Sequence, residues 1–351
     1  MQRYNRTVMP GAGLVLALFV SACGGEAPDA TSSTLQAALL TSGPVSDAGW
    51  YAGAYEGLLL IEDSLDAQVS HQQTATPAEF DEAFLAYGSS GYDLIFAHGF
   101  EYQDAAIRAG SRFPDATIVV SGGGRVADNV VPLIFRLEEG SYLAGMAAAS
   151  LTRSGIIGMV GGVAIPPARG TFVAFEAGAR SVNPDVEVLE TFTGDWNDVS
   201  AAKEAAVAQL SRGADIVIHN LDAASFGVFQ AVREAVADGR WVRAIGMNSD
   251  QNDVAPDVII GSAVIRIPEA FLETARRWEA GTVGGEPIYA SIREDVIDFV
   301  FNPELVDELP GGLVEEIADA RDRIRADELE VPRVRFVEGD DDPPPGAGDA
   351  P

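Results

Sequence analysis

Short apolar runs alternate with longer segments of helical periodicity from about residue 35 to residue 280. The runs are often β-branched and are short enough for strands, while the intervening segments gather apolar side chains on one helical face. Strands interleaved with helices predict βαβ units and mostly parallel sheets that are covered on both faces. We expect strands over 35–40, 94–97, 117–121, 131–135, 156–161, 186–192, 216–219 and 244–247, and helices over 52–65, 78–87, 103–112, 141–152, 171–181, 200–212, 226–237 and 270–280.

The length of the chain suits two lobes rather than one. It has 351 residues, of which 47% are hydrophobic, and this is enough for two cores of about 150 residues each. An open parallel sheet binds ligands beyond the carboxyl ends of its strands, and two such sheets that face each other enclose a cleft. The loops that follow strands are therefore where we expect the functional residues.

Charge and composition exclude several classes of function. Lys and Arg number 23 against 53 Asp and Glu, so the formal charge is −30, and a nucleic-acid partner is not expected because such binding needs many cationic contacts. The three histidines are scattered, the chain has one cysteine, and no zinc motif is present. We therefore expect no metal and no cofactor.

Both ends of the chain are expected to lie outside the fold. Residues 1–22 carry two arginines, then an apolar run too short to span a bilayer, and then small residues, which is the pattern of an export signal. Cys23 follows directly and is expected to be the lipidated N-terminus of a lipoprotein, the alternative being an ordinary buried thiol. Residues 23–34 are expected to form a flexible tether, and the acidic, proline-rich residues 336–351 a disordered tail.

Polar and aromatic residues follow four of the predicted strands. Asp47 and Trp50 come after the first strand, and Phe100 after the second. Asp222 and Phe226 follow the strand that ends near His219, and Asn248-Ser249-Asp250-Gln251 follows the next strand. Each group also has a simpler interpretation, as a turn or a helix cap. For Asp47 this is a helix cap, and for Trp50 it is a ring packed in the core. Together they favour a polar pocket with aromatic walls.

Other motifs give weaker signals. Gly122-x-Gly124-x-x-Ala127 follows a strand but no helix begins after it, so a dinucleotide phosphate would lack its helix N-terminus. No Walker A loop and no G-x-S-x-G nucleophile elbow is present. Asp195 and Asp198 could suggest calcium, but capping of the next helix by Asp198 is favoured.

Six segments follow one another in a specific order and spacing: GPVSDAGWYAGAYEGL (43–58), GYDLIFAHGFEYQDAAIRAGSRFPDA (91–116), EEGSYLAGMAAASLTRSGIIGMVGG (138–162), FEAGARSVNPDVEV (175–188), GDWNDVSAAKEAAVAQLSRGADIVI (194–218) and IGMNSDQ (245–251). In these segments the sequence resembles the basic membrane protein (Bmp) family of bacterial substrate-binding lipoproteins, which includes purine nucleoside receptors that feed ABC transporters.

The resemblance implies a type I periplasmic-binding fold, in which two doubly wound parallel-sheet lobes are joined by a hinge of three crossovers. The crossovers are expected near residues 136, 265 and 285. The first lobe would then comprise 35–136 plus 266–285, and the second 137–265 plus 286–335. Ligand would close the lobes, and an ABC permease would recognise the closed form.

The resemblance also implies roles for individual residues. Trp50 and Phe226 match the two aromatics that stack on a purine base, Asp47 matches the acidic residue ahead of the first, and Asn248 and Asp250 match the ribose-binding region. The chain departs from the family pattern at Tyr51, where many relatives have asparagine, at Asp222, where many have a small residue, and at Ser121–Gly124, where a strand-end aspartate is missing. The cationic residue that the family pattern places after the second crossover has no clear match, and Arg266 lies within one position of it. The stacking walls are thus kept while the polar contacts change.

The sequence therefore predicts a lipid-anchored receptor that is not an enzyme. It would be a monomer that binds a purine nucleoside or a related heterocycle and delivers it to an ABC importer. Two other classes stay open, namely a ligand sensor or adhesion lipoprotein without a transporter, and a cleft hydrolase that uses Asp47, Asp222 and Asp250 as acid and base.

Overall fold

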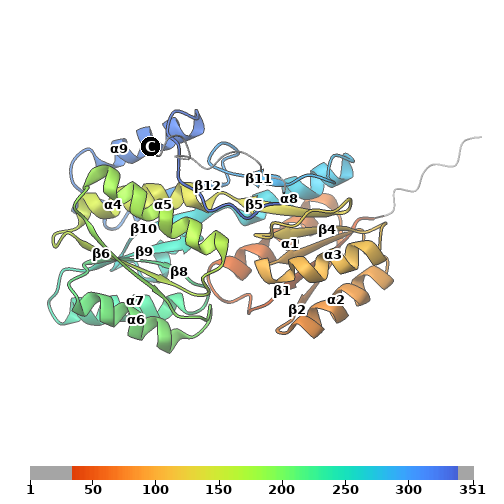
Figure 1. Ribbon diagram of the computed structural model, residues 1–351, viewed down its shortest axis with the longest axis horizontal. Coiled ribbons are helices and arrows are strands. Elements are labelled where there is room, and N and C mark those ends of the chain that lie inside the picture. The colour runs from red at the N-terminus through yellow and green to blue at the C-terminus, as the bar shows by residue number, and fades with distance from the viewer. Residues whose placement is uncertain (1–33, 339–351) are drawn as a thin grey trace, which may run out of the picture. The chain divides into compact units, whose positions relative to one another are not determined.

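The computed structural model describes residues 34–338, which belong to one compact unit and form two α/β lobes (Figure 1). The predicted signal sequence, the lipidation site at Cys23 and most of the predicted acidic tail lie outside these residues. Within them, no helix combines the length and the apolar character needed to span a bilayer.

The first lobe is built around a parallel six-stranded sheet in the order β11-β5-β4-β3-β1-β2. Helices α1 and α8 pack together on one face of this sheet, and α2 and α3 pack on the other. The central strands are buried because helices cover both faces. The elements are β1 (Gln36–Thr41), α1 (Trp50–Leu65), β2 (Gln68–Gln73), α2 (Pro77–Ser89), β3 (Leu94–His98), the 3₁₀ turn η1 (Phe100–Tyr102), α3 (Gln103–Arg112), β4 (Thr117–Ser121), β5 (Val130–Phe135), α8 (Ile267–Glu279) and β11 (Ile288–Ala290).

The second lobe repeats this arrangement with the order β12-β10-β9-β8-β6-β7, and its edge strand β12 is antiparallel to β10. Helices α4 and α5 pack together on one side, and α6 and α7 on the other. The elements are α4 (Leu137–Leu151), β6 (Ile156–Gly161), α5 (Pro166–Val182), β7 (Glu187–Phe192), α6 (Val199–Ser211), β8 (Ile216–Asn220), α7 (Ser225–Ala237), β9 (Arg243–Asn248), η2 (Asn252–Val254), β10 (Ile259–Ile265), β12 (Ile297–Phe301), η3 (Val306–Glu308) and α9 (Leu313–Arg325).

Between Thr34 and the end of α9 the chain passes between the lobes three times. It crosses at Arg136, between β5 and α4, and at Arg266, between β10 and α8. The third crossing follows Ala290, because β11 pairs with β5 in the first sheet. This differs from the expected crossing near residue 285, which assigned residues 286–335 as a whole to the second lobe. The strand is only three residues long and is flanked by exposed, polar sequence, so no apolar run marks it.

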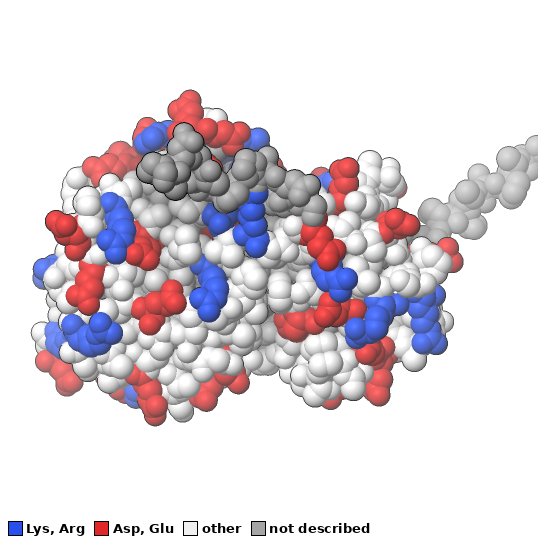
Figure 2. Space-filling model, in the orientation of Figure 1, with Lys and Arg blue, Asp and Glu red and all other residues white. Residues whose placement is uncertain are grey.

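Charged side chains are spread over the surface. On the face shown in Figure 2, acidic and basic groups are interspersed, so the excess of acidic residues does not form one patch there. Many of the arginines are paired with acidic residues on the surface, for example Arg108 with Asp81 and Arg233 with Asp257. Such exposed pairs contribute little to stability.

Candidate functional site

A cavity lies between the carboxyl ends of the two sheets. The space between its walls is about 740 Å³ when the open mouth is included. Almost every element that reaches it does so just past the end of a strand, as expected for facing α/β lobes. The first lobe contributes Trp50, Tyr51, Gly99, Phe100, Glu101, Gly122 and Phe135; later parts of the chain contribute Leu137, Glu138, Ile165, Pro167, Ala168, Thr171, Trp196, Asn220, Asp222, Asn248, Ile265 and Phe336.

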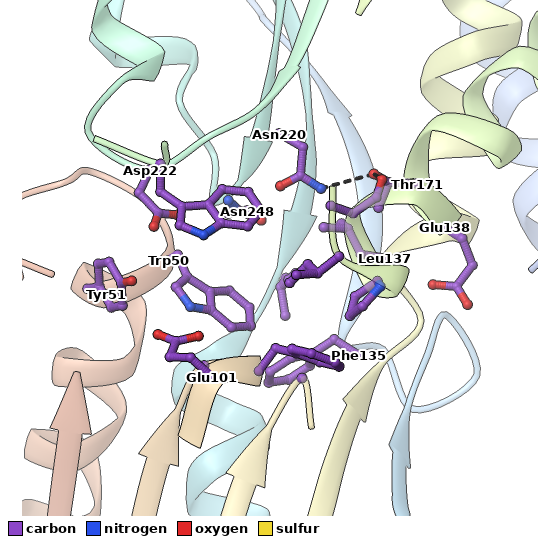
Figure 3. A pocket seen from close by; sticks show the side chains of 18 of the residues that line it. Trp50, Tyr51, Glu101, Phe135, Leu137, Glu138, Thr171, Asn220, Asp222 and Asn248 are labelled. Atoms are coloured by element: carbon purple, nitrogen blue, oxygen red, sulfur yellow. Dashed lines mark hydrogen bonds between the residues drawn. The ribbon is translucent and has the colours of Figure 1, made fainter. Parts of the chain in front are cut away.

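Trp50 forms one wall of the cavity (Figure 3). It is the first residue of α1, and its indole stacks on the imidazole of His98, with ring centroids 3.8 Å apart and planes at 28°. The edge of Phe135 meets it at 5.8 Å. One face of the indole is thus covered by His98, which leaves the other side to line the cavity.

His98 is a buried support for this indole. Its Nε2 lies 3.0 Å from the carbonyl oxygen of Trp50, and its Nδ1 lies 2.7 Å from Oγ of Ser121. Because a carbonyl can only accept, Nε2 carries the proton and Nδ1 accepts from the serine hydroxyl. Burial lowers the pKa of His98 to about 3, so the ring is neutral at physiological pH.

Asp47 does not reach the cavity. It is fully buried, and its carboxylate accepts hydrogen bonds from the backbone N–H groups of Gly49, Tyr51 and Ala52 at 2.9–3.2 Å. These are the otherwise unpaired donors at the start of α1. The capping interpretation of Asp47 therefore holds, and the carboxylate positions Trp50 rather than contacting a ligand.

Trp196 brings a second indole to the cavity, from the second lobe. It lies in the loop between β7 and α6, and its carbonyl oxygen accepts hydrogen bonds from the backbone N–H groups of Asp222 and Ala224. Its ring packs so closely on Gly162 that a Cβ added there would lie 2.2 Å from it. The backbone bonds and the glycine together fix the position of this ring.

Asp222 is the most strongly perturbed acid in the cavity. Burial raises its pKa well above the ordinary value, and the nearby carboxylates of Asp47 and Glu101 raise it further, while the Tyr51 hydroxyl partly opposes this. The Tyr51 hydroxyl also bonds to Ser42, at 2.8 Å, and Ser42 donates to Glu101. A protonated carboxyl can both donate and accept, so Asp222 suits a ligand edge that carries either kind of group.

Two amides complete the polar lining. Asn220 donates from its side-chain nitrogen to Oγ1 of Thr171 at 2.9 Å, which fixes the orientation of its amide (Figure 3). Asn248 is buried at the end of β9, donates to the carbonyl of Leu221, and has a left-handed backbone with φ of 72°. Figure 3 shows these amides and Asp222 on the opposite side of the cavity from Glu101 and Phe135.

The lobes also touch each other directly beside the cavity. The carbonyl oxygen of Ala48 in the first lobe accepts hydrogen bonds from the Ser249 hydroxyl at 2.7 Å and from the Gln251 amide at 3.2 Å. The amide oxygen of Gln251 lies 2.8 Å from Nε2 of His219, which holds that side chain in place. This contact joins two loops that are some 200 residues apart in sequence.

Three further predicted residues lie elsewhere. Phe226 is 39% exposed on α7 and faces a separate surface hollow with Phe229, so the predicted Trp50–Phe226 stacking pair does not enclose the cavity. Asp250 accepts from the backbone N–H of Asn252 within its own loop. Arg266 lies at the second crossover and pairs with Asp298 at 3.1 Å. The predicted residues that do meet in the cavity are Trp50, Tyr51, Phe100, Asp222 and Asn248.

The sequence reasoning missed several cavity residues. Trp196 lies in GDWND, within a segment that carries the family resemblance, but the two aspartates there indicate only capping or calcium, and no pattern marks the indole. In the structure Asp198 caps α6 by accepting from the backbone N–H of Ala201, and no acidic or histidine cluster among residues 34–338 could hold a metal ion. Glu101 lies in the resemblance segment 91–116 and Asn220 begins the polar strand end that contains Asp222, but neither was predicted as a site residue; Phe336 had no periodic or motif signal.

Comparison with known proteins identifies the family. The family described as ABC transporter substrate-binding protein, PnrA-like (Bmp), matches residues 34–334. The chain belongs to the Bmp family. It is therefore an ABC transporter substrate-binding protein by family, and such proteins act in the periplasm or outside the cell.

Relatives in this family have varied names. The chain is 28% identical to the transcriptional activator protein med of Bacillus subtilis, over 75% of this chain and 81% of that protein. It is 26% identical to basic membrane protein A2 of Borrelia garinii, over 90% and 93% of the two chains. It is 27% identical to a purine-binding protein of Brucella abortus, over 75% and 74%.

Solved structures support the fold. A solute-binding protein of an ABC transporter from Aeropyrum pernix matches with a TM-score of 0.78 at 21% identity, covering 87% of this chain and 95% of that one. A second, from Conexibacter woesei, matches with a TM-score of 0.70 at 25% identity, covering 86% and 100%. The predicted two-lobed type I periplasmic-binding fold is thereby confirmed.

Proposed function

We propose that this Bmp-family protein binds a purine nucleoside, or a planar heterocycle like it, in the cavity between its lobes and presents it to an ABC permease. The observation that carries the proposal is the pair of indoles, Trp50 from the first lobe and Trp196 from the second, lining one cavity. An indole offers a flat surface on which a base stacks, and such stacking contributes about 1–3 kcal/mol per base. The name of the purine-binding relative from Brucella abortus is consistent with this ligand class.

The polar groups of the cavity fit the rest of such a ligand. Asp222, Asn220 and Asn248 are buried and have amide or carboxyl groups that can bond a base edge or sugar hydroxyls. Glu101 is a further carboxyl on the first-lobe side. In this assignment Trp196 takes the role that Phe226 had in the sequence-based prediction, and Asp47 acts only as a positioning residue.

The proposal includes the cellular setting. The protein would be a monomer attached to the membrane through a lipid on Cys23, would use no cofactor, and would release its ligand chemically unchanged. No cluster of acidic or histidine residues among residues 34–338 could hold a metal ion, and the sequence contains no Walker A loop or G-x-S-x-G elbow.

The test is a ligand panel on the chain from Gly24 onward, which retains the whole compact unit that begins at Thr34. Adenosine, guanosine, inosine, uridine, the free purine bases and ribose are each added, and thermal unfolding is followed. Purine nucleosides should raise the unfolding midpoint, since ligand at 100 times its dissociation constant adds about 2.7 kcal/mol. No shift with any nucleoside or base would overturn the ligand assignment, and release of free base during incubation would overturn the non-enzymatic one.

A further inference from the structure

The last described residues of the chain form a segment that crosses between the lobes. After α9 the chain has no helix or strand from residue 331 to residue 338, and we name these residues the C-terminal strap. The strap starts in the second lobe, where Val331 is buried in the main core, and it passes beside α5, where a Cβ added to Gly170 would lie 3.7 Å from the nitrogen of Val334. Its course can be followed in Figure 1.

The far end of the strap is attached to the first lobe. The backbone N–H of Glu338 donates to the carbonyl of Gly124 at 2.7 Å, and its carboxylate pairs with Arg125 at 3.2 Å. A Cβ on Gly124 would lie 2.3 Å from the carbonyl oxygen of Phe336, so the strap can lie this close only because that residue is glycine. The glycine run after β4, which superficially matches a dinucleotide fingerprint, thus receives the chain's own C-terminal segment.

Between these attachments the strap places an aromatic ring at the cavity. Phe336 lines the cavity together with Trp50 and Asp222, and its ring meets that of Phe100 edge-on with centroids 6.2 Å apart. Residues 336–338 are therefore ordered against the protein, in contrast to the expected disordered tail over 336–351. The Bmp family match covers residues 34–334, so Phe336 lies two residues past its end.

We propose that the C-terminal strap is a lid on the ligand cavity and that Phe336 is a ligand-contacting residue. This inference rests on the proposed function for the nature of the ligand. Because the strap is attached to both lobes, it must shift when the lobes separate, and its docking favours the closed form. Its outer attachment includes a backbone hydrogen bond and a half-exposed ion pair, and exposed ion pairs of this kind contribute little to stability, so this end can open and close during ligand exchange.

Docking of the strap can be tested without any ligand. In the chain from Gly24 onward no cysteine is present, so the double variant Arg125→Cys with Glu338→Cys carries the only two thiols. Under mild oxidation this pair should form an intramolecular disulfide, because the two side chains meet at the first lobe. The control pair is Lys203→Cys with Glu338→Cys, since Lys203 is on α6, on the opposite side of the second sheet from α5. Equal yields from the two pairs would overturn the docked strap.

The role of the ring is tested by the release rate of adenosine, followed by tryptophan fluorescence. Phe336→Ala should release adenosine at least tenfold faster than the unmodified chain, whereas Phe226→Ala, the same change at an exposed ring outside the cavity, should leave the rate within twofold. The disulfide formed after adenosine is bound should slow release. An unchanged release rate in Phe336→Ala would overturn the lid. Tighter adenosine binding in this variant would also overturn it, because it would mean that the Phe336 ring occupies the space of the ligand. If the unmodified chain binds no nucleoside, the proposed function fails, and the disulfide yield alone decides whether the strap docks.

Discussion

The two indoles that line the cavity are held by different means. Trp50 rests on His98, whose neutral ring is fixed by Ser121 on one side and by a backbone carbonyl on the other. Trp196 packs on Gly162 and is held through its own carbonyl oxygen. Both rings are therefore positioned before a ligand arrives, so little conformational entropy is lost on binding.

Replacing either indole should weaken binding much more than replacing Phe226. Trp50→Ala and Trp196→Ala should each lower the affinity for the nucleoside that binds best in the panel by roughly 5- to 150-fold, which corresponds to about 1–3 kcal/mol of stacking. Trp196→Phe should restore part of the loss, and Phe226→Ala should have no effect. Titration calorimetry measures all four variants, and an affinity loss in Phe226→Ala as large as that in Trp196→Ala would contradict the assignment.

The sequence predicts a ring at the cavity correctly for Trp50 but not for Phe226, and the difference has a physical reason. Trp50 follows β1 directly and starts α1, so its place at the strand end is fixed by local sequence. Phe226 also starts a helix, but the first turn of α7 presents that ring to solvent. Which side of a helix start faces a cleft depends on how the helix packs, and single-sequence patterns do not contain this information.

Among the secondary-structure elements, the first turn of α1 links a helix cap to the wall of the cavity. The carboxylate of Asp47 accepts three backbone hydrogen bonds there, and the next residues of the same turn are Trp50 and Tyr51. The adjacent carbonyl of Ala48 receives the contact from the second lobe. One helix terminus thus carries both a cavity wall and an interlobe contact.

Removing this cap should lower both stability and affinity. Asp47→Ala should reduce the free energy of unfolding by about 0.5–2 kcal/mol and should weaken nucleoside binding several-fold, because the first turn that carries Trp50 loosens. Asp47→Asn, which keeps an acceptor oxygen, should recover much of both. Thr76→Ala is the matched control, since Thr76 caps α2 by accepting from the N–H of Glu79 and α2 contributes nothing to the cavity. Thr76→Ala should lower stability and leave affinity unchanged. If Asp47→Ala does the same, Asp47 has no positioning role.

Among residues 34–338 the periodic pattern predicted α1 to α8 and eight of the strands, most of which have an apolar run or face. It missed β2, whose sequence QVSHQQ is polar because the strand lies at the sheet edge. It also missed α9, although the four buried residues of this helix, Leu313, Ile317, Ala320 and Ile324, have helical spacing. It also missed β10, β11 and β12. β10 ends at the second crossover, β11 lies between the second and the third, and β12 follows the third, in a part of the chain whose order no longer alternates regularly between strand and helix.

At the scale of the whole described unit, the lobes are joined by three crossovers, and two of these contact each other. Glu139, in the first turn of α4 next to the crossover at Arg136, accepts a hydrogen bond from the backbone N–H of Ile292 in the third crossover at 2.8 Å. The pKa of Glu139 is raised from 4.5 to about 7, mainly by burial and also by the neighbouring Glu138 carboxylate, against the opposing effects of the hydrogen bond from Ile292 and of Arg136 and Arg333. The hinge therefore contains an acid that titrates near neutral pH.

Ionisation of Glu139 should make folding less favourable as pH rises. The folded chain holds this proton more tightly than the unfolded chain, so the penalty is absent below about pH 4.5, grows between the two pKa values and is complete above about pH 7. Glu139→Gln keeps an acceptor oxygen for Ile292 and removes the titration. Its free energy of unfolding should be close to that of the unmodified chain at pH 5 and should exceed it at pH 8 by up to about 3 kcal/mol, from 1.36 kcal/mol per pKa unit.

Urea unfolding at the two pH values measures this difference. Glu315→Gln is the matched control, because it changes an exposed glutamate in the first turn of α9, and its stability should follow that of the unmodified chain at both pH values. If the free energies of unfolding of Glu139→Gln and the unmodified chain differ by the same amount at pH 5 and at pH 8, Glu139 does not take up this proton. If the difference is found, nucleoside affinity should also fall from pH 6 to pH 8 in the unmodified chain more than in Glu139→Gln, because the same two crossovers must hold their places when the lobes close.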